Sequence, residues 1–540
     1  MTILNFNRKR FEKDVGKLDE KMQENIALFG TPVENLSDDE LQIEIFPNRP
    51  DLLSYGNYVN AFNSFLGKKT GLRKIKINKP EKDFVVNIDS SVANVRPYTV
   101  CAIVKNLKLT DDKIKEIIDI QEKLHLTLGR KRKKVAIGVY PLEKIKLPIS
   151  YKAMKPEEIK FRPLEFPNEL TGRQILVKHP AGRDYGMLLN GLDKFPVFVD
   201  ANNQILSMPP IINSHETGKI TLDTKNVFIE CSGFDFDNCN KILNILIMAF
   251  EFMGGKIYQI NLKGNKNILT PDLIPEKIKL SIANVNRLLG LDLKEKEIKN
   301  LLEKMGHDYN KGFVFVSSSR ADVLHEVDLI EDIAIAYGYD KFIPEIPQIS
   351  TIGNIDSKEI IKKKISEILI GLGLIETMSY HLISKDSIKK LEDNPKEYMP
   401  VKNSKTEHEF LRKNLSNYLL KIFSENVDVE YPQEIFQIGR VFEELEEKDN
   451  LAIAISPGNF TKLKQILDYF SKMLNMELIV EEASVFPNWF IEGRVVSIVF
   501  NGKEIGFFGE VHPKILDNFK IKMPVALLEI SLNEIMNFLI

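Results

Sequence analysis

Four carboxylates gather in one short stretch of the chain, Asp322, Asp328, Glu331 and Asp332. The last three follow one another at the spacing i, i+3 and i+4, which on a helix places their side chains on one face, about 6 Å apart. Asp322 precedes the expected helix and can fold back toward it. Because like charges this close repel one another, a compensating cation is expected, and oxygen ligands alone favour a hard ion such as Mg²⁺.

The spacing alone leaves a second interpretation open, an acidic helix face exposed to water, which is the more frequent outcome. The surrounding elements indicate a compact unit over residues 266–345, in which Ser281 is expected to cap a helix. The expected strands are residues 277–280 and 313–316, and the expected helices are residues 282–289, 294–305 and 326–337. This alternation suggests a winged-helix-like module.

The preceding segment, residues 91–265, is richer in expected strands. A hairpin is predicted around the turn Asp200–Asn203. The expected strands are residues 196–199, 205–207, 219–222 and 227–230, and a helix is expected from about residue 237 to residue 253. Gly254 and Gly255 provide the stop signal of that helix.

Further segments lie on either side. In residues 1–90, Pro47 and Pro50 favour an extended start, and Asp51 is expected to cap the helix that follows. A linker rich in Pro and Ile, residues 343–353, precedes a last block in which helices, at 358–372 and 412–426, mix with strands. We expect a multidomain α+β protein with an antiparallel sheet in that block. The expected domains are residues 1–90, 91–265, 266–345 and 355–540.

The bulk composition bounds the class of protein. A length of 540 residues predicts about three to five domains. The net charge of −2 gives no overall attraction to nucleic acid, so any RNA contact must come from local basic patches. Three cysteines without a CxxC pair argue against a disulfide framework or a zinc site and favour a reducing compartment.

The chain shows no targeting or membrane signal. The first residues lack the apolar core of a signal peptide. The longest apolar run, Ile245–Phe250, is too short to span a bilayer. We expect a cytoplasmic protein with no membrane partner and no DNA partner.

The carboxylates also lie in a recognisable string, D-x5-D-x2-E-D followed by I-A-x-A-Y-G-Y, over residues 322–339. This string closely resembles the module that precedes the synthetase-like domain in phenylalanyl-tRNA synthetase β subunits. The resemblance implies that Asp322, Asp328, Glu331 and Asp332 bind Mg²⁺ near the contact with the catalytic α subunit. It therefore favours the metal interpretation over the exposed acidic face.

The resemblance extends over nearly the whole chain, with the matching strings in the expected order. They are Asn48–Ser54, Leu128–Ile145, Met208–Thr221, Thr224–Asp235, Tyr431–Phe442 and Phe507–Phe519. The second, third and fourth of these strings are similar to the archaeal and eukaryotic branch. The bacterial branch carries additional tRNA-binding and anticodon-binding domains, for which 540 residues leave no room.

The last domain is expected to lack aminoacylation chemistry. A class II synthetase holds ATP through an Arg in an FRxE-type strand and an Arg in a late GxGxxR-type motif. The nearest match, Gly371–Glu376, ends in Glu and comes too early, and neither FRxE nor a P-loop occurs. The resemblance implies a partner, the catalytic α subunit, in a heterotetramer with two copies of each subunit that attaches phenylalanine to tRNA(Phe) with ATP.

A second chemistry is implied by residues 91–265, which resemble the family's editing domain, a hydrolase for tyrosine wrongly attached to tRNA(Phe). A hydrophobic pocket rejects an added hydroxyl only about 100-fold, so an editing pocket should bind that hydroxyl through hydrogen bonds. Glu230 and Ser232 share one strand face, and Ser207 lies on the neighbouring hairpin. We take Ser207, Glu230 and Ser232, together with Asn213, as candidate pocket groups. The alternative is a strand whose polar side faces water.

Two other functions stay open. One is a free-standing trans-editing hydrolase. The other is a non-enzymatic winged-helix nucleic-acid-binding protein, which needs a basic recognition helix, whereas the expected third helix is acidic. The basic run Arg130–Lys134 is either a contact for phosphates or a solvated loop.

Overall fold

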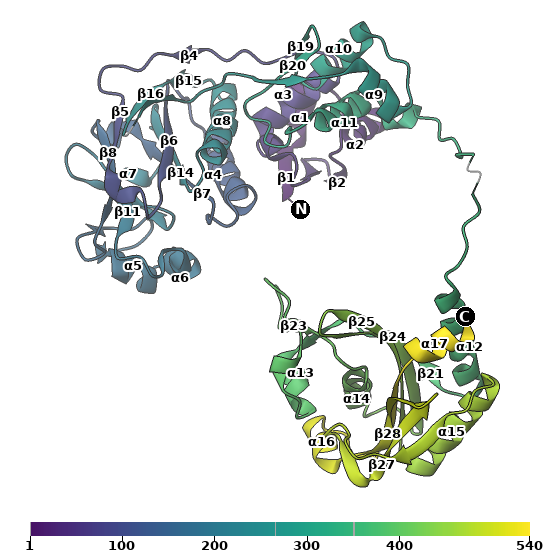
Figure 1. Cartoon of the computed structure of the whole chain (residues 1–540). Helices are drawn as coiled ribbons and strands as arrows, with labels where there is room; N and C mark the ends of the chain where they lie inside the picture. Colours follow the sequence, from purple (N-terminus) through teal and green to yellow (C-terminus); the bar gives the residue numbers. More distant parts are fainter. Residues whose placement is uncertain (1, 265, 349–350) are drawn as a thin grey trace. The chain divides into compact units, whose positions relative to one another are not determined.

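The computed structural model describes residues 2–264, 266–348 and 351–540. Contacts divide the chain into two units, Met1–Glu345 and Ile346–Ile540 (Figure 1). Both units mix helices with sheets, so the chain is a multidomain α+β protein, as predicted. None of the helices in the described parts is long and apolar enough to cross a membrane.

Unit 1 begins with a three-stranded antiparallel sheet in the order β1-β3-β2. Its strands are β1 (Thr2–Asn7), β2 (Val33–Leu36) and β3 (Glu40–Ile45), and its helices are α1 (Arg8–Asp14), α2 (Glu20–Leu28) and α3 (Tyr55–Phe65). The predicted cap of α3 was wrong. Ser54 caps that helix by accepting from the Asn57 N–H at 3.2 Å, because Asp51 is held by both arms of the Arg49 guanidinium at 2.9 Å.

Two larger sheets follow, packed face to face. The first has the order β4-β15-β6-β14-β7, and the second has the order β13-β12-β11-β8-β5-β16-β17. The first consists of β4 (Ile77–Asn78), β15 (Lys256–Tyr258), β6 (Tyr98–Lys105), β14 (Val227–Gly233) and β7 (Val135–Pro141). The second consists of β13 (Ile212–Asn213), β12 (Ile205–Met208), β11 (Phe195–Val199), β8 (Ile149–Met154), β5 (Val85–Ile88), β16 (Ile260–Lys263) and β17 (Asn267–Thr270).

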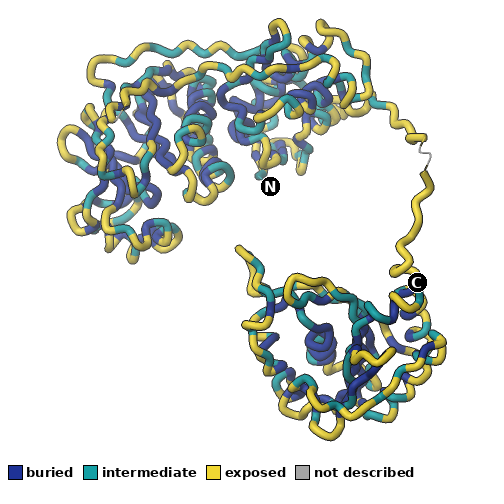
Figure 2. Tube along the Cα trace, in the orientation of Figure 1, coloured by how far each residue is buried: buried dark blue, intermediate teal, exposed yellow. Residues whose placement is uncertain are grey.

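The two faces of the five-stranded sheet serve different cores. Val100 and Ala102 of β6 face a core built with α4 (Asp111–Leu126) and α8 (Phe236–Phe252). Cys101 of β6 and Phe228 of β14 face the seven-stranded sheet. Every residue of β14 is buried, so its polar side chains lie inside the protein (Figure 2). This excludes the interpretation of a strand whose polar side faces water.

The predicted hairpin is present as β11 and β12, which pair antiparallel. The strand predicted at residues 219–222 was wrong, because that segment is irregular after the short helix α7 (His215–Gly218). Thr221 and Thr224 close a turn there, in which the Thr221 N–H donates to Thr224 Oγ1 at 3.1 Å. Such local side-chain bonds compete with the hydrogen bonds of a sheet.

Unit 1 ends with three helices and a small antiparallel sheet in the order β18-β20-β19. The strands are β18 (Glu276–Lys279), β19 (Asp308–Asn310) and β20 (Phe313–Val316), and the helices are α9 (Ile282–Leu289), α10 (Glu295–Lys304) and α11 (Glu326–Tyr337). Ser281 caps α9 as predicted, accepting from the Asn284 N–H at 3.3 Å. Helix α11 carries the carboxylates Asp328, Glu331 and Asp332.

Unit 2 is built on a seven-stranded sheet in the order β21-β24-β25-β29-β28-β27-β26. The strands are β21 (Ile375–Glu376), β24 (Gln433–Glu443), β25 (Glu446–Ser456), β26 (Ile479–Glu482), β27 (Phe490–Phe500), β28 (Lys503–Val511) and β29 (Ala526–Ser531). All neighbours pair antiparallel except β21 with β24. The antiparallel sheet expected here is therefore present, with one parallel edge strand.

Helices cover both faces of this sheet. One face packs against α12 (Ser357–Gly371), α15 (Phe460–Met473) and α17 (Asn533–Leu539), and the other packs against α14 (Ser416–Glu425) and α16 (Pro513–Asn518) (Figure 1). Helix α14 begins four residues later than predicted. The reason is Arg412, whose buried guanidinium donates to the carbonyls of Ser379 and Arg440 and holds its backbone outside the helix. Of the predicted linker, residues 349 and 350 lie outside the described residues, and the rest belongs to no helix or strand.

Candidate functional site

A buried tyrosine hydroxyl joins three of the four predicted pocket residues. Tyr140 Oη on β7 lies 2.8 Å from Ser207 Oγ, 3.1 Å from Glu230 Oε1 and 3.4 Å from Asn213 Oδ1. These partners come from β12, β14 and β13. The two packed sheets therefore bring together Ser207, Asn213 and Glu230, and they add Tyr140, which the sequence reasoning missed.

Burial sets the protonation of this group. Glu230 is 2% exposed, and burial raises the pKa of its carboxyl to about 8, although a hydrogen bond from Tyr140 and the charge of Arg96 act the other way. Burial likewise raises the pKa of Tyr140 well above its ordinary value. Both groups are therefore neutral near pH 7. Glu230 Oε2 has no hydrogen-bond partner among the described residues, so one polar atom of the carboxyl is available to a ligand.

A glycine makes room for this arrangement. Gly138 on β7 faces Glu230 on β14 across the sheet. A Cβ atom at Gly138 would lie 2.6 Å from Glu230 Oε1 and closer still to Tyr140 Oη. Only glycine therefore fits the position without displacing one of the two side chains.

Glu230 and Asn213 line a cavity of about 380 Å³. One wall is helix α4, which contributes Ile114, Ile118 and His125 from one helical face, and Ile137 and Val139 of β7 also line the cavity. The walls combine eleven apolar residues with eight polar or charged ones. A cavity with this mixed lining can hold an organic group that carries polar atoms.

The mouth of this cavity carries a linked set of charged side chains. His125 Nε2 accepts from the Ile137 N–H at 2.9 Å, so Nδ1 is the protonated nitrogen and donates to Glu122 Oε1 at 3.3 Å. Arg132 Nη2 donates to the same oxygen at 3.0 Å. Burial lowers the pKa of His125, whereas the hydrogen bond from His125 and the charge of Arg132 lower the pKa of Glu122 to about 2. The set is therefore a neutral imidazole beside an ion pair.

Ser232, the fourth predicted pocket residue, makes no hydrogen bond to Tyr140. It is fully buried on the same strand as Glu230, but Arg96 holds it, with Nε 3.3 Å from Ser232 Oγ and Nη2 2.7 Å from its carbonyl. Ser232 is not among the residues that line the cavity.

The four carboxylates of the second predicted site share a different cavity, of about 690 Å³. The N-terminal part of unit 1 also contributes to this cavity, through Phe29, Thr31 and Arg49. The predicted folding back of Asp322 toward the helix is observed, since Asp322 and Asp332 contact the same cation.

That cation is the guanidinium of Arg320. Its Nε and Nη2 donate to the two oxygens of Asp322 at 2.8 and 2.7 Å, and Nη2 lies 2.9 Å from Asp332 Oδ2. His307 Nε2 lies 2.7 Å from the same oxygen of Asp332. Burial alone would raise the pKa of Asp332, but the charge of Arg320 and the hydrogen bond to His307 hold it below its ordinary range. The sequence contains this signal, because Arg320 stands two residues before Asp322.

As arranged, the four carboxylates together do not form one metal site. Within residues 2–264, 266–348 and 351–540, no group of three His, Cys, Asp or Glu side chains is placed to hold one. Asp328 Oδ2 accepts from the N–H groups of Leu324 and His325 at 2.8 and 2.7 Å. Glu331 is exposed and bonds to no other described side chain. The cation expected from charge repulsion is present at two of the four carboxylates, but it is an arginine.

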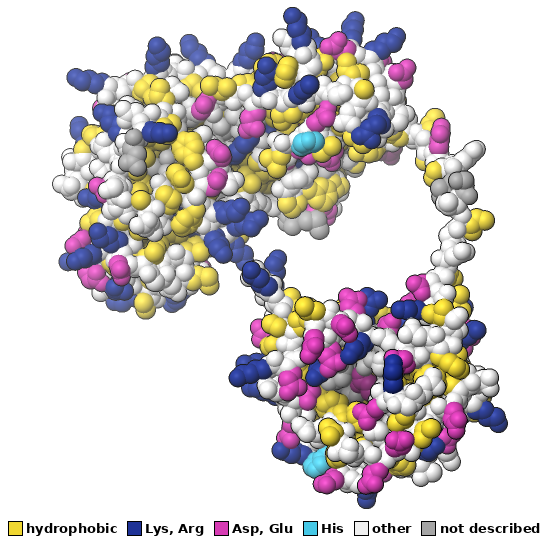
Figure 3. Space-filling view, viewed as in Figure 1, with side chains coloured by type: hydrophobic (Ala, Val, Ile, Leu, Met, Phe, Trp, Pro, Cys, Tyr) yellow, Lys and Arg dark blue, Asp and Glu magenta, His cyan; other side chains and the backbone are white. Residues whose placement is uncertain are grey.

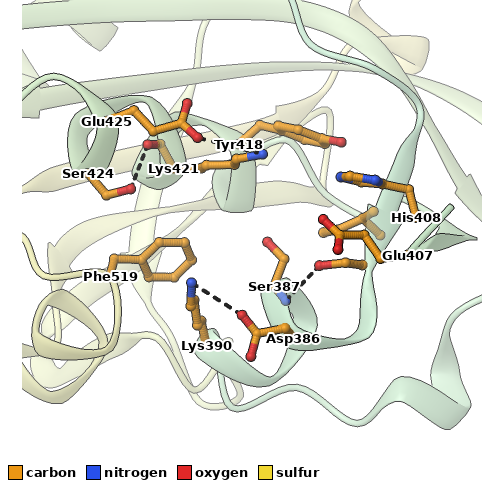
Figure 4. A pocket seen from close by; sticks show the side chains of 12 residues that line it. Asp386, Ser387, Lys390, Glu407, His408, Tyr418, Lys421, Ser424, Glu425 and Phe519 are labelled. Carbon is orange, nitrogen blue, oxygen red and sulfur yellow. Dashed lines mark hydrogen bonds and ion pairs between the residues drawn. The ribbon is translucent and has the colours of Figure 1, made fainter.

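Unit 2 has a smaller polar cavity of about 200 Å³ between α13 (Lys385–Lys390) and α14 (Figure 4). Two of its lysines pair with a nearby acid, Lys390 with Asp386 at 3.3 Å and Lys421 with Glu425 at 3.8 Å. On the sheet, Arg440 of β24 pairs with Glu447 of β25 at 2.6 Å. The Glu529 carboxylate accepts from the Leu415 and Ser416 N–H groups, both at 2.9 Å, at the start of α14.

Three family models match the chain. A phenylalanyl-tRNA synthetase beta chain CLM domain covers residues 343–532, a tRNA synthetase B5 domain covers residues 278–339, and a B3/4 domain covers residues 92–243. The group around Tyr140 falls in the B3/4 match, and the four carboxylates fall in the B5 match.

Known proteins are similar to this chain over most of its length. The phenylalanine–tRNA ligase beta subunit of Archaeoglobus fulgidus is 36% identical over 545 residues, covering 99% of this chain and 98% of that protein. The phenylalanine–tRNA ligase beta subunit of Pyrococcus abyssi is 38% identical over 501 residues, covering 90% of this chain and 89% of that protein. The crystal structure of an N-terminal fragment of the phenylalanyl-tRNA synthetase beta subunit from Pyrococcus horikoshii matches with a TM-score of 0.59 and 35% identity, covering 63% of this chain and all of the fragment.

Proposed function

Because this chain belongs to the family of phenylalanine–tRNA ligase beta subunits, we propose that it acts as the non-catalytic subunit of a ligase that attaches phenylalanine to its tRNA with ATP. A catalytic α subunit supplies the aminoacylation site. The similarity to whole beta subunits over nearly the full length carries this proposal. The sheet of unit 2 supports it, since Arg440 is paired with Glu447 and Glu529 covers the start of α14. The glycine match at residues 371–376 is the end of α12 and a turn, in which Gly373 has φ 91°.

An exposed apolar strip supports docking of a partner on unit 2. Ile375 of the edge strand β21 is 66% exposed, and Met378 and Tyr380, which follow it, are 94% and 86% exposed. Apolar side chains beside an open sheet edge mark a protein interface. We propose that this strip contacts the catalytic subunit.

Co-expression with the α subunit tests this role. The two chains should co-purify as a heterotetramer, and only the complex should charge tRNA with phenylalanine. Met378→Glu combined with Tyr380→Glu should separate the chains, whereas Leu445→Glu, at a 92% exposed position in the turn after β24, should not. A stable monomer that hydrolyses mischarged tRNA alone would instead support the free-standing editing enzyme.

We further propose that the cavity beside Glu230 is the site at which the ester between tRNA(Phe) and a wrongly attached tyrosine is hydrolysed. The supporting observation is the neutral, buried Glu230 carboxyl, which has one oxygen without a partner among the described residues and lies in the wall of this cavity. A protonated carboxyl both donates and accepts, which matches the phenol hydroxyl of tyrosine. Phenylalanine would leave Glu230 unpaired, and a site built to bind a hydroxyl rejects the analogue that lacks it by about 10⁴-fold. Tyr140 contacts Glu230 directly, and Ser207 and Asn213 contact Tyr140.

The direct assay compares two substrates on the wild-type complex. Tyr-tRNA(Phe) should be hydrolysed much faster than Phe-tRNA(Phe). Equal rates for the two esters would contradict the proposal that Glu230 recognises the hydroxyl group of tyrosine.

For magnesium we propose a narrower site than the four carboxylates expected from the sequence. Asp328 and Glu331 are the two that Arg320 leaves free, and both face the 690 Å³ cavity. Mg²⁺ bound there would be structural, because it would lie between α11 and the N-terminal part of unit 1, in the cavity that Phe29 and Arg49 also line. Titration calorimetry should show Mg²⁺ binding that Asp328→Asn weakens together with assembly of the complex. Absence of binding to the wild type would reject a magnesium site at this cluster.

A further inference from the structure

The loop between α4 and β7 combines charge with an unusual backbone. It carries five consecutive basic residues, Arg130, Lys131, Arg132, Lys133 and Lys134. The first three have φ angles of 47°, 54° and 63°, in the left-handed region that side chains other than glycine rarely adopt. Such a conformation persists only where the surrounding structure holds it in place, and it is concentrated at functional sites.

Arg132 is the residue that holds this loop. Its Nη1 donates to the Ile211 carbonyl at 2.9 Å, its Nη2 donates to Glu122 at 3.0 Å, and its guanidinium lies 4.4 Å from the centre of the Tyr185 ring. Its own carbonyl accepts from Arg96 at 3.3 Å. Arg132 lines the same cavity as Glu230. The loop is therefore fixed to the mouth of that cavity through one inward-pointing arginine.

The other four cations of the loop point outward. Arg130, Lys131, Lys133 and Lys134 are exposed, and none forms an ion pair with another residue in the described parts of the chain. Figure 3 shows Lys and Arg side chains gathered on the side of unit 1 where this loop lies. Since the net charge of the chain is −2, these cations are a local concentration of positive charge. We call these four residues the basic rim.

We propose that the basic rim binds the phosphodiester backbone of the single-stranded 3′ end of tRNA as its aminoacyl ester enters the cavity beside Glu230. This inference rests on the proposed editing function. Consecutive exposed cations match the repeating phosphates of a nucleic acid strand and bind it without regard to sequence. Because Arg132 both fixes the loop and lines the cavity, the loop places these cations next to the cavity. Arg132 acts as a positioning residue for the rim.

The test removes rim charge without touching the cavity. In the complex with the α subunit, Lys131→Gln, Lys133→Gln and Lys134→Gln are combined, and hydrolysis of Tyr-tRNA(Phe) is followed at increasing salt. The slope of log(kcat/KM) against log[salt] is negative, and each lost phosphate contact should make it shallower by about 0.7, so the slope of the triple variant should be shallower by about 2. KM should rise about tenfold near physiological salt while kcat stays unchanged.

Two controls make the outcome decisive. A matched triple, Lys74→Gln, Lys76→Gln and Lys79→Gln, removes the same charge from other exposed positions of unit 1 and should leave the slope unchanged. A substrate without phosphates, the tyrosyl ester of adenosine, should be hydrolysed equally by the wild type and the rim variant. A rim variant with the wild-type slope, or one that loses activity equally on both substrates, overturns the inference. Absence of hydrolysis by the wild-type complex would instead overturn the editing function on which it rests.

Discussion

At the scale of single residues, Glu230 keeps its proton where exposed carboxylic acids have lost theirs. Strand β14 buries it in the wall of the cavity, and Tyr140, which lies within hydrogen-bond distance of it, is itself neutral. Desolvation therefore outweighs the hydrogen bond in setting its pKa. A neutral carboxyl suits the recognition of an uncharged hydroxyl better than an anion does, because it can both donate and accept a hydrogen bond.

This protonation makes stability depend on pH. The folded protein holds the Glu230 proton up to about pH 8, whereas an ordinary glutamate releases it near 4.5. The contribution to the free energy of unfolding is therefore complete below pH 4.5 and is lost as the pH rises toward 8.

Glu230→Gln removes the titrating group and keeps the shape of the side chain. The stability of this variant relative to the wild type should rise between about pH 5 and pH 8, by at most about 1.4 kcal/mol per pH unit. Urea unfolding of both proteins at several pH values measures the difference. A difference that does not vary with pH would show that Glu230 is already ionised in the folded protein.

Arg320 is the cation that neutralises two of the four carboxylates of the second site. It is 4% exposed and neutralises Asp322 and the buried Asp332. Arg320→Met should destabilise unit 1 by about 3–5 kcal/mol, because it leaves a buried carboxylate without its cation. Lys299→Met, which breaks the exposed pair with Glu303, should cost less than about 1 kcal/mol. Denaturant unfolding compares the two, and equal small effects would show that Arg320 does not neutralise the cluster.

At the scale of elements, the pairing of β7 with β14 brings Tyr140 and Glu230 together. Gly138 lies opposite Glu230, and Tyr140 of the same strand reaches the space that Gly138 leaves open. The group is therefore a product of register, since a shift by one residue would turn Glu230 to the opposite face of the sheet.

Gly138→Ala tests that dependence. The added methyl group must displace Tyr140 or Glu230, so we expect a loss of about 1–3 kcal/mol in stability and a marked fall in hydrolysis of Tyr-tRNA(Phe). Gly371→Ala, at the end of α12, is the control, because its Cβ meets no atom within 4 Å. Normal hydrolysis by Gly138→Ala would show that the cavity does not need the Tyr140 contact.

Local patterns in the sequence were sufficient for some elements and not for others. Helix α11 has the predicted bounds, and the hairpin of β11 and β12 forms at the predicted turn, because both depend on neighbours in the chain. Tyr140 was missed because its contact with Glu230 joins residues 90 positions apart. The cap of α3 was assigned to Asp51 because the competing contact with Arg49 depends on tertiary packing.

At the scale of the whole molecule, the chemistry is divided between the two units. Unit 1 holds the cavity beside Glu230, the basic rim and the carboxylates around Arg320. Unit 2 carries a sheet on which Arg440 and Lys448 pair with Glu447 and Glu443, and an exposed strip beside β21. This division fits a subunit that corrects the product of a partner rather than making it.

The most direct test is a pair of rates measured on one complex. With Glu230→Ala in the chain and an unchanged α subunit, charging of tRNA(Phe) with phenylalanine should proceed at the wild-type rate. Hydrolysis of Tyr-tRNA(Phe) should fall roughly 10- to 100-fold, the effect of losing one hydrogen bond to a buried group. Hydrolysis at the wild-type rate, or loss of both activities in a correctly assembled complex, would contradict the account.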